Sequence, residues 1–356
     1  WRQLAAQSVD ANPFYEPDYL LASARHLEKA DIRCIVIYRD GARNSDMIGL
    51  FPLNTFTLHG GVRLPALEFY QNPYVCLTAP LVHREDPAGV WECFLDCLKR
   101  SSDVPRLMHA AQFASARQTY ASLIEVLARR GIAHEAVSTF ERASIKRLAD
   151  FDSYLARLSS NRRKDVARRE RRLAEQGEVS FRLIRGGDER GDALDTMLTL
   201  EKSGWKGDGG TALACTPDTE AFARAAFLGK TGSIALLAVD GTPIAACACL
   251  SSHRTLFTVK IAHDEAYRAF GPGTLLDMKM ARTLTSPSAG YRRLDSCSSA
   301  GNPVEKYWID REPITTLAFL TSEEVSTGWL HGFVAGLRGL DRLKELVRTV
   351  RNRSGL

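Results

Sequence analysis

The chain has 356 residues, of which 45% are hydrophobic and 25% are charged, and its formal net charge is +5. These proportions are typical of globular proteins, and they exclude fibrous, collagen-like and largely disordered chains. At about 150 residues per domain, the length predicts two domains, each able to bury a core. No apolar run reaches the roughly 18–20 residues that a membrane-spanning helix needs.

The positive charge is concentrated in two segments. Residues 161–172 carry seven basic and two acidic side chains, and residues 331–356 carry six basic and two acidic ones. The rest of the chain is therefore mildly acidic. This distribution excludes a uniformly basic nucleic-acid-binding protein and predicts two basic helices on a mildly acidic body.

The eight cysteines do not have the spacing of a disulfide framework. No CxxC pair occurs, and no group of cysteines and histidines has zinc-binding spacing, so no metal is predicted. We expect buried, reduced thiols, which fit a cytoplasmic location.

The first part of the chain predicts alternating helices and strands. Between them, residues 59–80 are punctuated by glycine and proline and receive no element. In chain order we expect a helix over 17–29, strands over 33–38 and 46–53, helices over 88–100 and 114–130, and a strand over 132–145.

The second part has a more regular pattern. Asp152 is expected to cap a short helix, and Ser159 or Ser160 to cap the basic helix that follows. The further elements expected are a strand over 178–184, a helix over 188–202, a glycine-rich loop over 204–210, a helix over 219–228, strands over 233–239, 243–250 and 255–263, a helix over 272–283, a strand over 292–297, a short helix capped by Asn302, and a strand over 314–320.

The turn at residues 268–273, which reads RAFGPG, is the most informative motif. It follows a predicted strand, and a helix begins at once. Such a turn directs unpaired backbone N–H groups at one point, where the helix dipole also favours negative charge. Gly271 and Gly273 lack the Cβ that would hold a phosphate away, and Arg268 can add a bidentate contact. The motif predicts a pyrophosphate cradle; an ordinary tight turn is the alternative.

This strand, RxxGxG turn and helix resemble the acyl-CoA-binding motif of GNAT acyltransferases. Six segments occur in the order seen in acetyltransferases of the bacterial cellulose and exopolysaccharide biosynthesis type, a branch related to Fem-type aminoacyl transferases. They are NPFYEPDYL, SSNRRKDVARRERRLAEQGEVSF, EKSGWKGDGGTALA, DGTPIAACACL, KIAHDEAYRAFGPGTLL and LDSCSSAGNPVEKYW.

The resemblance implies a mixed α/β fold of tandem GNAT-like domains, each with a mixed, mostly antiparallel sheet flanked by helices. Residues 1–140 would form a degenerate GNAT-like domain without its own cofactor. Residues 141–330 would form the acyl-CoA-binding catalytic domain, and residues 331–356 a basic amphipathic helix.

The resemblance also implies which residues hold the cofactor, acetyl-CoA or another acyl-CoA. The backbone of 260–262 would bind the pantetheine arm, the turn would bind the pyrophosphate, and Thr274 would lie over the phosphates. The branch has Ser-Pro-Gly where this chain has Gly271-Pro272-Gly273, so a serine contact is lost while the backbone cradle remains. The cofactor residues expected are Lys260, Ile261, Ala262, Arg268, Ala269, Phe270, Gly271, Gly273 and Thr274.

The implied chemistry is direct attack of an amine on a thioester, which needs a base and an acid for the leaving thiolate. Asp264 is the first choice for base or ammonium anchor, with a cap or a salt bridge to Lys260 as the alternative. Glu201 is a weaker catalytic candidate. Tyr307 or Tyr267 could protonate the thiolate, or either could be a core tyrosine.

Four residues are expected to bind the acceptor. Trp205 and Lys206 lie on the glycine-rich loop, a candidate acceptor lid, although Trp205 could instead anchor that loop to the core. Asp295 and Lys306 lie in motif segments, and Asp295 could equally be structural.

Each of the two basic segments has more than one possible role. Helix 161–172 has few apolar residues and could be solvated, could contact tRNA, or could attract an anionic cofactor or polysaccharide. The C-terminal helix could dock onto the body or lie on a membrane surface, and docking is preferred.

The sequence therefore predicts a cytoplasmic acyl-CoA-dependent N-acyltransferase. Its acceptor would be a small-molecule or saccharide amine in the groove between the halves, possibly an amino sugar or an envelope or exopolysaccharide precursor. A Fem-like transferase that uses aminoacyl-tRNA is the first alternative. A non-catalytic scaffold for polysaccharide synthesis, with a filled or collapsed cofactor cleft, is the second.

Overall fold

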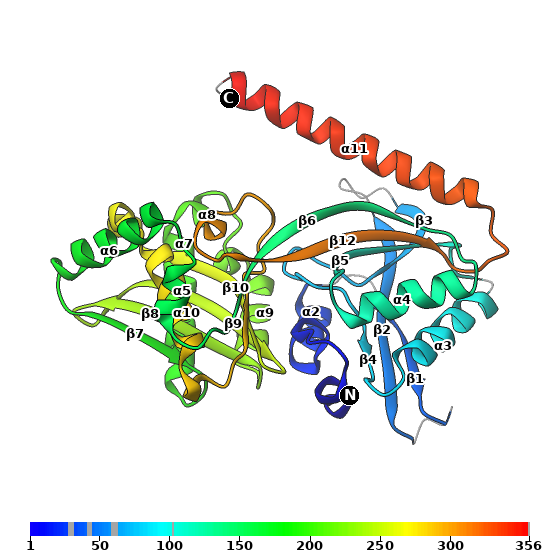
Figure 1. Ribbon diagram of the computed structural model, residues 1–356, viewed down its shortest axis with the longest axis horizontal. Helices are drawn as coiled ribbons and strands as arrows, with labels where there is room; N and C mark the ends of the chain where they lie inside the picture. The colour runs from blue at the N-terminus through cyan, green and yellow to red at the C-terminus, as the bar shows by residue number, and fades with distance from the viewer. Residues whose placement is uncertain (28–31, 41–44, 58–62, 102, 355–356) are drawn as a thin grey trace.

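A computed structural model describes residues 1–27, 32–40, 45–57, 63–101 and 103–354. These residues form a mixed α/β fold around one continuous sheet, which Figure 1 shows running through both halves of the molecule. The expected mixed α/β class is confirmed. The strand order is β1-β2-β3-β5-β12-β6-β11-β10-β9-β8-β7, with β4 paired to β2.

The first half contains five strands of this sheet and a helical layer. Its helices are α1 (Arg2–Gln7), α2 (Pro17–His26), α3 (Pro87–Arg100) and α4 (Gln118–Arg129), and its strands are β1 (Arg33–Tyr38), β2 (Met47–Thr57), β3 (Arg63–Phe69), β4 (Leu81–Val82) and β5 (Leu107–Ala114). Asp86 caps α3 through the N–H of Gly89. The apolar face of α3 then packs onto the sheet, where Phe94 stacks on Phe51 with ring centroids 4.2 Å apart.

The second half has its own five strands, with helices on both faces. The strands are β7 (Val179–Ile184), β8 (Gly232–Val239), β9 (Thr242–Ser252), β10 (Thr255–His263) and β11 (Arg293–Asp295). The helices are α5 (Phe151–Ala156), α6 (Ser160–Ala174), α7 (Glu189–Ser203), α8 (Trp205–Asp208), α9 (Pro217–Phe227) and α10 (Pro272–Thr285). The turn between β8 and β9 places Asp240 and Gly241 at φ +48° and +77°, as a tight hairpin of this sequence requires.

Two long strands join the halves. β6 (His134–Lys146) pairs with β11 of the second half, and β12 (Asp310–Leu320), the last strand of the chain, pairs with β5 of the first half. β6 and β12 also pair with each other along their length, side by side across the middle of the molecule (Figure 1). The boundary expected at residue 140 therefore falls inside a strand, and the two halves share one sheet.

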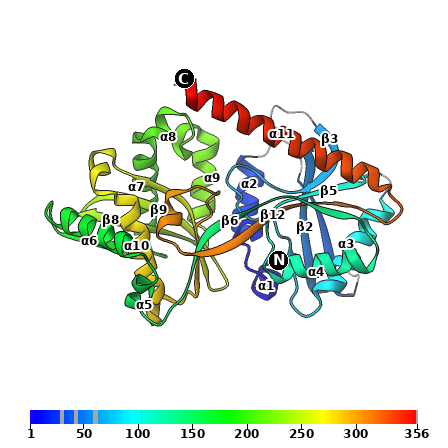
Figure 2. The ribbon, with the colours of Figure 1, turned by 45° about the horizontal axis from the view of Figure 1, so that its top comes forward.

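Helix packing adds a second connection between the halves. α2 of the first half packs against α9 of the second, where the ring of Tyr19 meets that of Phe222 edge-on at 5.3 Å. Figures 1 and 2 both show α2 beside α9, between the halves. The loop after β3 joins this contact, because Tyr74 stacks on the same Phe222 ring at 5.5 Å.

Several sequence-based expectations are wrong in detail. The helix expected from residue 114 begins at Gln118, and β5 precedes it; this strand is buried on both faces, so it has no alternating pattern to reveal it. β3 lies in the region left without an element. Asp150, and not Asp152, caps α5, through the N–H of Ser153.

Other details match or extend the prediction. Ser159 caps α6 by accepting a hydrogen bond from the N–H of Arg162. The short helix after Asn302 is a 3-10 helix, η5 (Pro303–Lys306). All eight cysteines are free, but Cys34 and Cys93 are exposed, contrary to the expectation of buried thiols.

The C-terminal helix α11 (Thr327–Ser354) docks onto the body through its first turns. Leu330 and Val334 are buried, and the Arg338 guanidinium donates hydrogen bonds to Glu135 and to the backbone of β6. Farther along the helix, Leu343 is exposed. The preferred docking is thus right for the start of α11. No described helix is long and apolar enough to cross a membrane.

Candidate active site

β10 and β11 separate after a short parallel contact. Their pairing covers only Thr255–Phe257 against Arg293–Asp295, whereas β10 continues to His263 with β9 along its other edge. A bulge in the pairing of β10 with β9, between Thr258 and Lys260, lies just beyond the point where β10 and β11 separate. The backbone of β10 beyond this point therefore faces open space on the β11 side, among the residues that the structure describes.

A pocket of about 550 Å³ fills this opening. It runs between the first turn of α10 and Glu201 on α7, with the open edge of β10 along its length. The lining residues are Leu200, Glu201, Gly204, Lys206, Ile261, Ala262, His263, Glu265, Arg268, Gly271, Pro272, Gly273, Thr274, Asp277, Asn302, Pro303 and Val304.

The predicted phosphate cradle forms one end of the pocket. Gly271 adopts φ +67°, the left-handed conformation that favours glycine, and α10 begins at Pro272. The N–H groups of Gly273 and Thr274 lie in the first helical turn, where no carbonyl four residues earlier can accept them. Arg268 lines the pocket beside them. The structure thus brings together these four predicted residues at a site suited to an anion.

Two residues of the predicted cradle lie elsewhere. Between β10 and Gly271 the chain forms a 3-10 helix, η3 (Glu265–Phe270), and not a bare turn. Ala269 is exposed on η3 and is not part of the pocket wall. The ring of Phe270 lies under the Arg172 guanidinium of α6, 5.4 Å from its centroid.

A buried carboxylate with two lysines forms the other end of the pocket. Glu201 is 1% exposed, and its Oε2 accepts a hydrogen bond of 2.8 Å from the N–H of Leu213. Its Oε1 lies 3.2 Å from Nζ of Lys260 and 3.5 Å from Nζ of Lys206. Burial and the Lys260 charge lower the pKa of Lys206, while Glu201 opposes this shift. The arrangement gathers three predicted residues into one ionic cluster.

Lys206 also contacts β10, the strand that was predicted to bind the pantetheine arm. Its Nζ donates a hydrogen bond of 2.7 Å to the carbonyl oxygen of Ile261, on the open edge of β10. The first half of the chain reaches this cluster as well, because the Tyr74 ring centroid lies 5.1 Å from Nζ of Lys260. A cation this close to an aromatic face is held by it electrostatically.

Asp264 and Tyr307 were expected to act in catalysis, but neither lines the pocket. Asp264 caps η3, with its carboxylate accepting a hydrogen bond of 2.9 Å from the N–H of Ala266, which was the alternative to a catalytic role. Tyr307 is buried, and its hydroxyl donates a hydrogen bond of 2.7 Å to Asp165. Burial and the Asp165 charge raise the pKa of Tyr307. Tyr267 lies partly exposed on η3.

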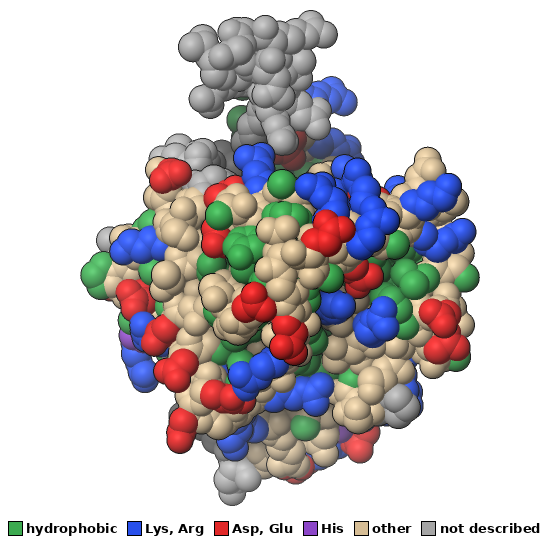
Figure 3. All heavy atoms as spheres, turned by 90° about the vertical axis from the view of Figure 1, so that its left-hand side faces the viewer, with side chains coloured by type: hydrophobic (Ala, Val, Ile, Leu, Met, Phe, Trp, Pro, Cys, Tyr) green, Lys and Arg blue, Asp and Glu red, His purple; other side chains and the backbone are tan. Residues whose placement is uncertain are grey.

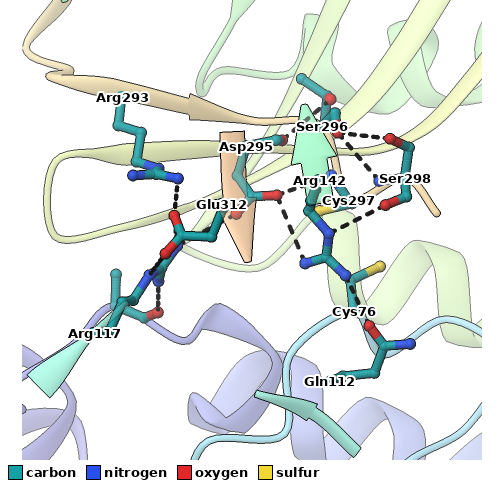
Figure 4. A network of polar contacts seen from close by, with 12 residues as sticks. Cys76, Gln112, Arg117, Arg142, Arg293, Asp295, Ser296, Cys297, Ser298 and Glu312 are labelled. Carbon is teal, nitrogen blue, oxygen red and sulfur yellow. Dashed lines mark hydrogen bonds and ion pairs between the residues drawn. The ribbon is translucent and has the colours of Figure 1, made fainter. Parts of the chain in front are cut away.

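Asp295, predicted to bind substrate, belongs to an ionic network between the halves. It is fully buried, lies 3.3 Å from Arg117 and 3.8 Å from Arg142, and accepts a hydrogen bond of 3.0 Å from the N–H of Cys297. Figure 4 shows Asp295 and Glu312 among three arginines, with Arg293 paired to Glu312. This network holds the crossing strands together.

Of the two other predicted acceptor residues, Lys306 does not line the pocket. Lys306 is exposed at the end of η5. Trp205 begins the short helix α8, but its side chain lies outside the described residues.

The basic helix α6 lies against the cradle. The Arg169 guanidinium is so close to Gly271 that a side chain at position 271 would collide with it. The carboxylate of Asp165 holds Arg169 by a hydrogen bond of 2.8 Å. Figure 3, which views the second half, shows Lys and Arg side chains gathered near the top of this face with acidic ones among them. The helix is thus partly solvated and partly packed on the candidate anion site.

Sequence reasoning missed Glu265 of the pocket wall. It also missed a second carboxyl group there, Asp277. It lies on α10 three residues after Thr274, and its burial raises the pKa from 3.8 to about 8. The spacing was the available signal, since residues three apart share a helix face and the surrounding LLDMKM segment is otherwise apolar on that face.

Comparisons with known proteins agree with this geometry. A family model described as an acetyltransferase (GNAT) domain matches residues 160–307, less than half of the chain. No curated protein matches the chain. Among solved structures, FemX is similar over 93% of this chain and 96% of that chain, with a TM-score of 0.59 and 12% identity.

Two further structures have similar folds. The C-terminal domain (DUF2156) of a putative lysylphosphatidylglycerol synthetase from Agrobacterium fabrum covers 94% of both chains, with a TM-score of 0.54 and 13% identity. A conserved protein of unknown function from Bacteroides thetaiotaomicron covers 90% of this chain and 96% of its own, with a TM-score of 0.55 and 14% identity. At such identities these similarities concern the fold alone.

Residues 160–307 therefore have a GNAT-type acyltransferase fold and match the model of an acetyltransferase (GNAT) domain. The resemblance to the GNAT superfamily is confirmed at that level, and the exopolysaccharide branch stays a prediction.

Proposed function

We propose that this protein is an acyl-CoA-dependent N-acyltransferase, with acetyl as the first acyl group to test and a small-molecule or saccharide amine as acceptor. One observation carries the proposal: a single pocket joins a helix start suited to an anion, the open edge of β10 and the buried cluster at Glu201. A scaffold protein that binds no acyl donor would not require one pocket that connects these three features. The eight free thiols support a reducing cytoplasm as its location.

The residues present fit an acyl-CoA at three places. The N–H groups of Gly273 and Thr274, with Arg268, would hold the phosphates. The backbone of Ile261, whose carbonyl oxygen lies on the open edge of β10, would pair with an amide of the pantetheine arm, whereas the backbone of Ala262 faces β9. Arg169 adds positive charge on the far side of Gly271. The bound acyl-CoA would supply an activated thioester at the end of the pocket where Glu201 lies.

The reaction would form a C–N bond to the acceptor amine and break the C–S bond of the thioester, with the thiolate taking a proton. We assign to Lys206 and Glu201 together the role of accepting the proton that the acceptor ammonium loses. Burial lowers the pKa of Lys206, which makes its neutral form more accessible, and Glu201 stabilises the ammonium once it forms. Lys260 keeps Glu201 in position.

Calorimetric titration with acetyl-CoA tests this function. Gly271→Val is a poor probe, because φ +67° and the Arg169 contact would strain the fold. Gly273→Val is better: a Cβ there meets Ile261 and His263 at ordinary contact distances of 3.7 and 3.9 Å, so a larger side chain fills the pocket.

The matched control is Gly186→Val, at a glycine with open space around it. We expect micromolar binding by the wild type and by the control, and at least a tenfold loss in Gly273→Val. Absence of binding by the wild type would refute acyl-CoA dependence.

A second candidate is a transferase that uses aminoacyl-tRNA, and one observation favours it: the arginine-rich helix α6 lies beside the pocket mouth. This function predicts tRNA binding that weakens steeply with salt, together with no affinity for CoA. Filter binding of tRNA between 50 and 200 mM salt, compared with a variant of the exposed residues Arg168 and Arg171, decides between the two.

A further inference from the structure

An apolar groove of about 750 Å³ lies beside the C-terminal helix α11 on the first half of the molecule. None of the described residues that line it is charged, and none of them lines the candidate active site. A second apolar hollow of about 330 Å³ adjoins the groove, and Trp329 lines both. The groove walls come from the starts of β3 and β5 and from α11, and they include Leu64, Pro65, Leu107, Trp329, Phe333 and Leu340.

α11 has two apolar stripes, and the body covers one of them. Leu330 and Val334, spaced at i and i+4, are buried against the first half. Trp329, Leu340 and Leu343 lie on a different stripe, at i, i+11 and i+14, with exposed fractions of 65%, 38% and 57%. The described residues expose four large hydrophobic side chains, and these are three of the four. The second stripe is therefore an apolar surface without a partner in the described part of the chain.

Contacts at the start of α11 fix the position of this stripe. The Phe333 ring packs edge-on against Phe56 of β2, with ring centroids 5.6 Å apart. The Arg338 guanidinium lies 2.7 Å from the carboxylate of Glu135 on β6. Because the helix is held from both β2 and β6, it cannot turn its second stripe onto the body without breaking these contacts. A fixed, contiguous apolar surface of this kind is typical of an interaction site.

The charge of α11 indicates what the stripe contacts. Between Asp341 and Ser354 the helix has five basic and two acidic residues. Figures 1 and 2 both show the C-terminal end of α11 pointing away from the first half. An exposed apolar stripe with a tryptophan, followed by basic residues on the same helix, is the pattern of helices that lie in the headgroup region of a bilayer. An anionic lipid surface offers acyl chains to the stripe and negative charge to the basic residues.

We propose that α11 and the adjoining apolar groove dock onto the surface of an anionic lipid bilayer. Trp329, Leu340 and Leu343 enter the boundary between headgroups and acyl chains, and the basic end of α11 lies against the headgroups. Removal of the apolar side chains from water drives the contact, and the basic residues add an attraction that salt weakens. This inference concerns a surface that the proposed acyl-CoA function does not use.

Co-sedimentation of the full chain with vesicles tests the proposal. One set of vesicles contains equal amounts of phosphatidylcholine and phosphatidylglycerol, and the other contains phosphatidylcholine alone. We expect the wild type to bind the anionic vesicles at least about tenfold more strongly in about 0.1 M salt, and this preference should shrink in about 0.5 M salt.

Leu343→Ser tests the apolar stripe. We expect it to bind anionic vesicles about five- to tenfold more weakly than the wild type, because less apolar surface leaves water. Leu21→Ser on α2 is the matched control, since Leu21 is 51% exposed and Leu343 is 57% exposed. The control should bind within about twofold of the wild type, and circular dichroism verifies the fold of both variants.

A triple variant of Lys344, Arg348 and Arg351 to Gln tests the basic end of α11. We expect at least about a tenfold loss of binding to the anionic vesicles and little change with phosphatidylcholine alone. Its control removes the same charge from exposed positions of the other basic helix, α6, by changing Arg162, Lys164 and Arg171 to Gln. This control should bind within about twofold of the wild type.

Fluorescence quenching shows whether the stripe itself enters the bilayer. Anionic vesicles with bromine atoms on the acyl chains should quench the emission of Trp329. Trp329→Phe keeps an apolar ring, so it should bind within a few-fold of the wild type and lose this quenching.

Three results would each overturn the proposal: no co-sedimentation of the wild type with anionic vesicles, an equal loss of binding in Leu343→Ser and Leu21→Ser, and unchanged quenching in Trp329→Phe. Self-association of the wild type without vesicle binding, measured by sedimentation equilibrium and lost in Leu343→Ser, would also overturn it and assign the stripe to a second copy of the chain. None of these results affects the acetyl-CoA titration, so the two proposals fail separately.

Discussion

Lys206 donates a hydrogen bond from Nζ to the carbonyl oxygen of Ile261, 2.7 Å away, and so ties the short helix α8 to the open edge of β10. The same carbonyl is one that a bound pantetheine arm would use. Gly204 and Gly207 lie on either side of Lys206 in the chain, which suits a segment that changes position on binding. Lys206 thus links donor binding to the Glu201 cluster.

Replacing Lys206 by Met removes the donor but keeps most of the stem. Because the Ile261 carbonyl is freed, worth about 1 kcal/mol, we expect acetyl-CoA to bind up to about fivefold more tightly. Turnover should fall by about 10²–10⁴, since the proton acceptor is lost. Calorimetry and steady-state kinetics measure the two effects. Lys202→Met, on the exposed side of α7, is the control. Weaker donor binding by Lys206→Met would contradict this role.

Glu201→Gln tests the other member of the proton-accepting pair. The amide keeps the shape of the side chain but removes the charge that faces Lys206 and Lys260, so we expect kcat to drop by about 10²–10³ with little change in the Kd for acetyl-CoA. Glu265→Gln, at the same pocket but half-exposed, should retain near wild-type kcat. Unchanged turnover in Glu201→Gln would remove Glu201 from the mechanism.

The raised pKa of Asp277 predicts how the stability of the protein depends on pH. Its folded-state pKa, about 8, lies above the ordinary value of 3.8, so the folded state binds the proton more tightly and the carboxyl destabilises the fold progressively as the pH rises. Asp277→Asn should therefore gain stability relative to the wild type between about pH 4 and 8, by up to about 1.4 kcal/mol per pH unit. Urea unfolding at pH 5, 7 and 9 measures this difference. A gain that does not vary with pH would contradict the raised pKa.

Substitution of Asp295 tests the ionic network that joins the two halves. Asp295→Ala leaves Arg117 and Arg142 without their shared carboxylate in a buried site, and the expected loss of stability is about 3–5 kcal/mol. The control is Glu189→Gln, which breaks the exposed pair with Arg182 and should cost less than about 1 kcal/mol. Denaturant unfolding monitored by tryptophan fluorescence gives both values. A loss in Asp295→Ala no larger than in the control would show that the network contributes little.

The helices and strands with one polar and one buried face could be predicted from the sequence. α3 and the strand–turn–helix unit around Gly271 and Gly273 are examples, because capping residues, amphipathic spacing and glycine each act over a few neighbours. β5 could not, since burial on both faces leaves no alternation. Trp205 was predicted to act at the acceptor side, which stays a prediction.

For the site, the sequence by itself determined which residue types were available for an anion cradle and a proton acceptor: Arg268, Gly271, Gly273 and Thr274 within one short segment, and Glu201 and Lys206 in another. Only the tertiary structure decided that Glu201 faces Lys260, that Asp295 serves the contact between the halves, and that Asp277 lines the pocket. Charge pairing and burial depend on segments far apart in the chain, and the exchange of β6 and β12 between the halves brings those segments together.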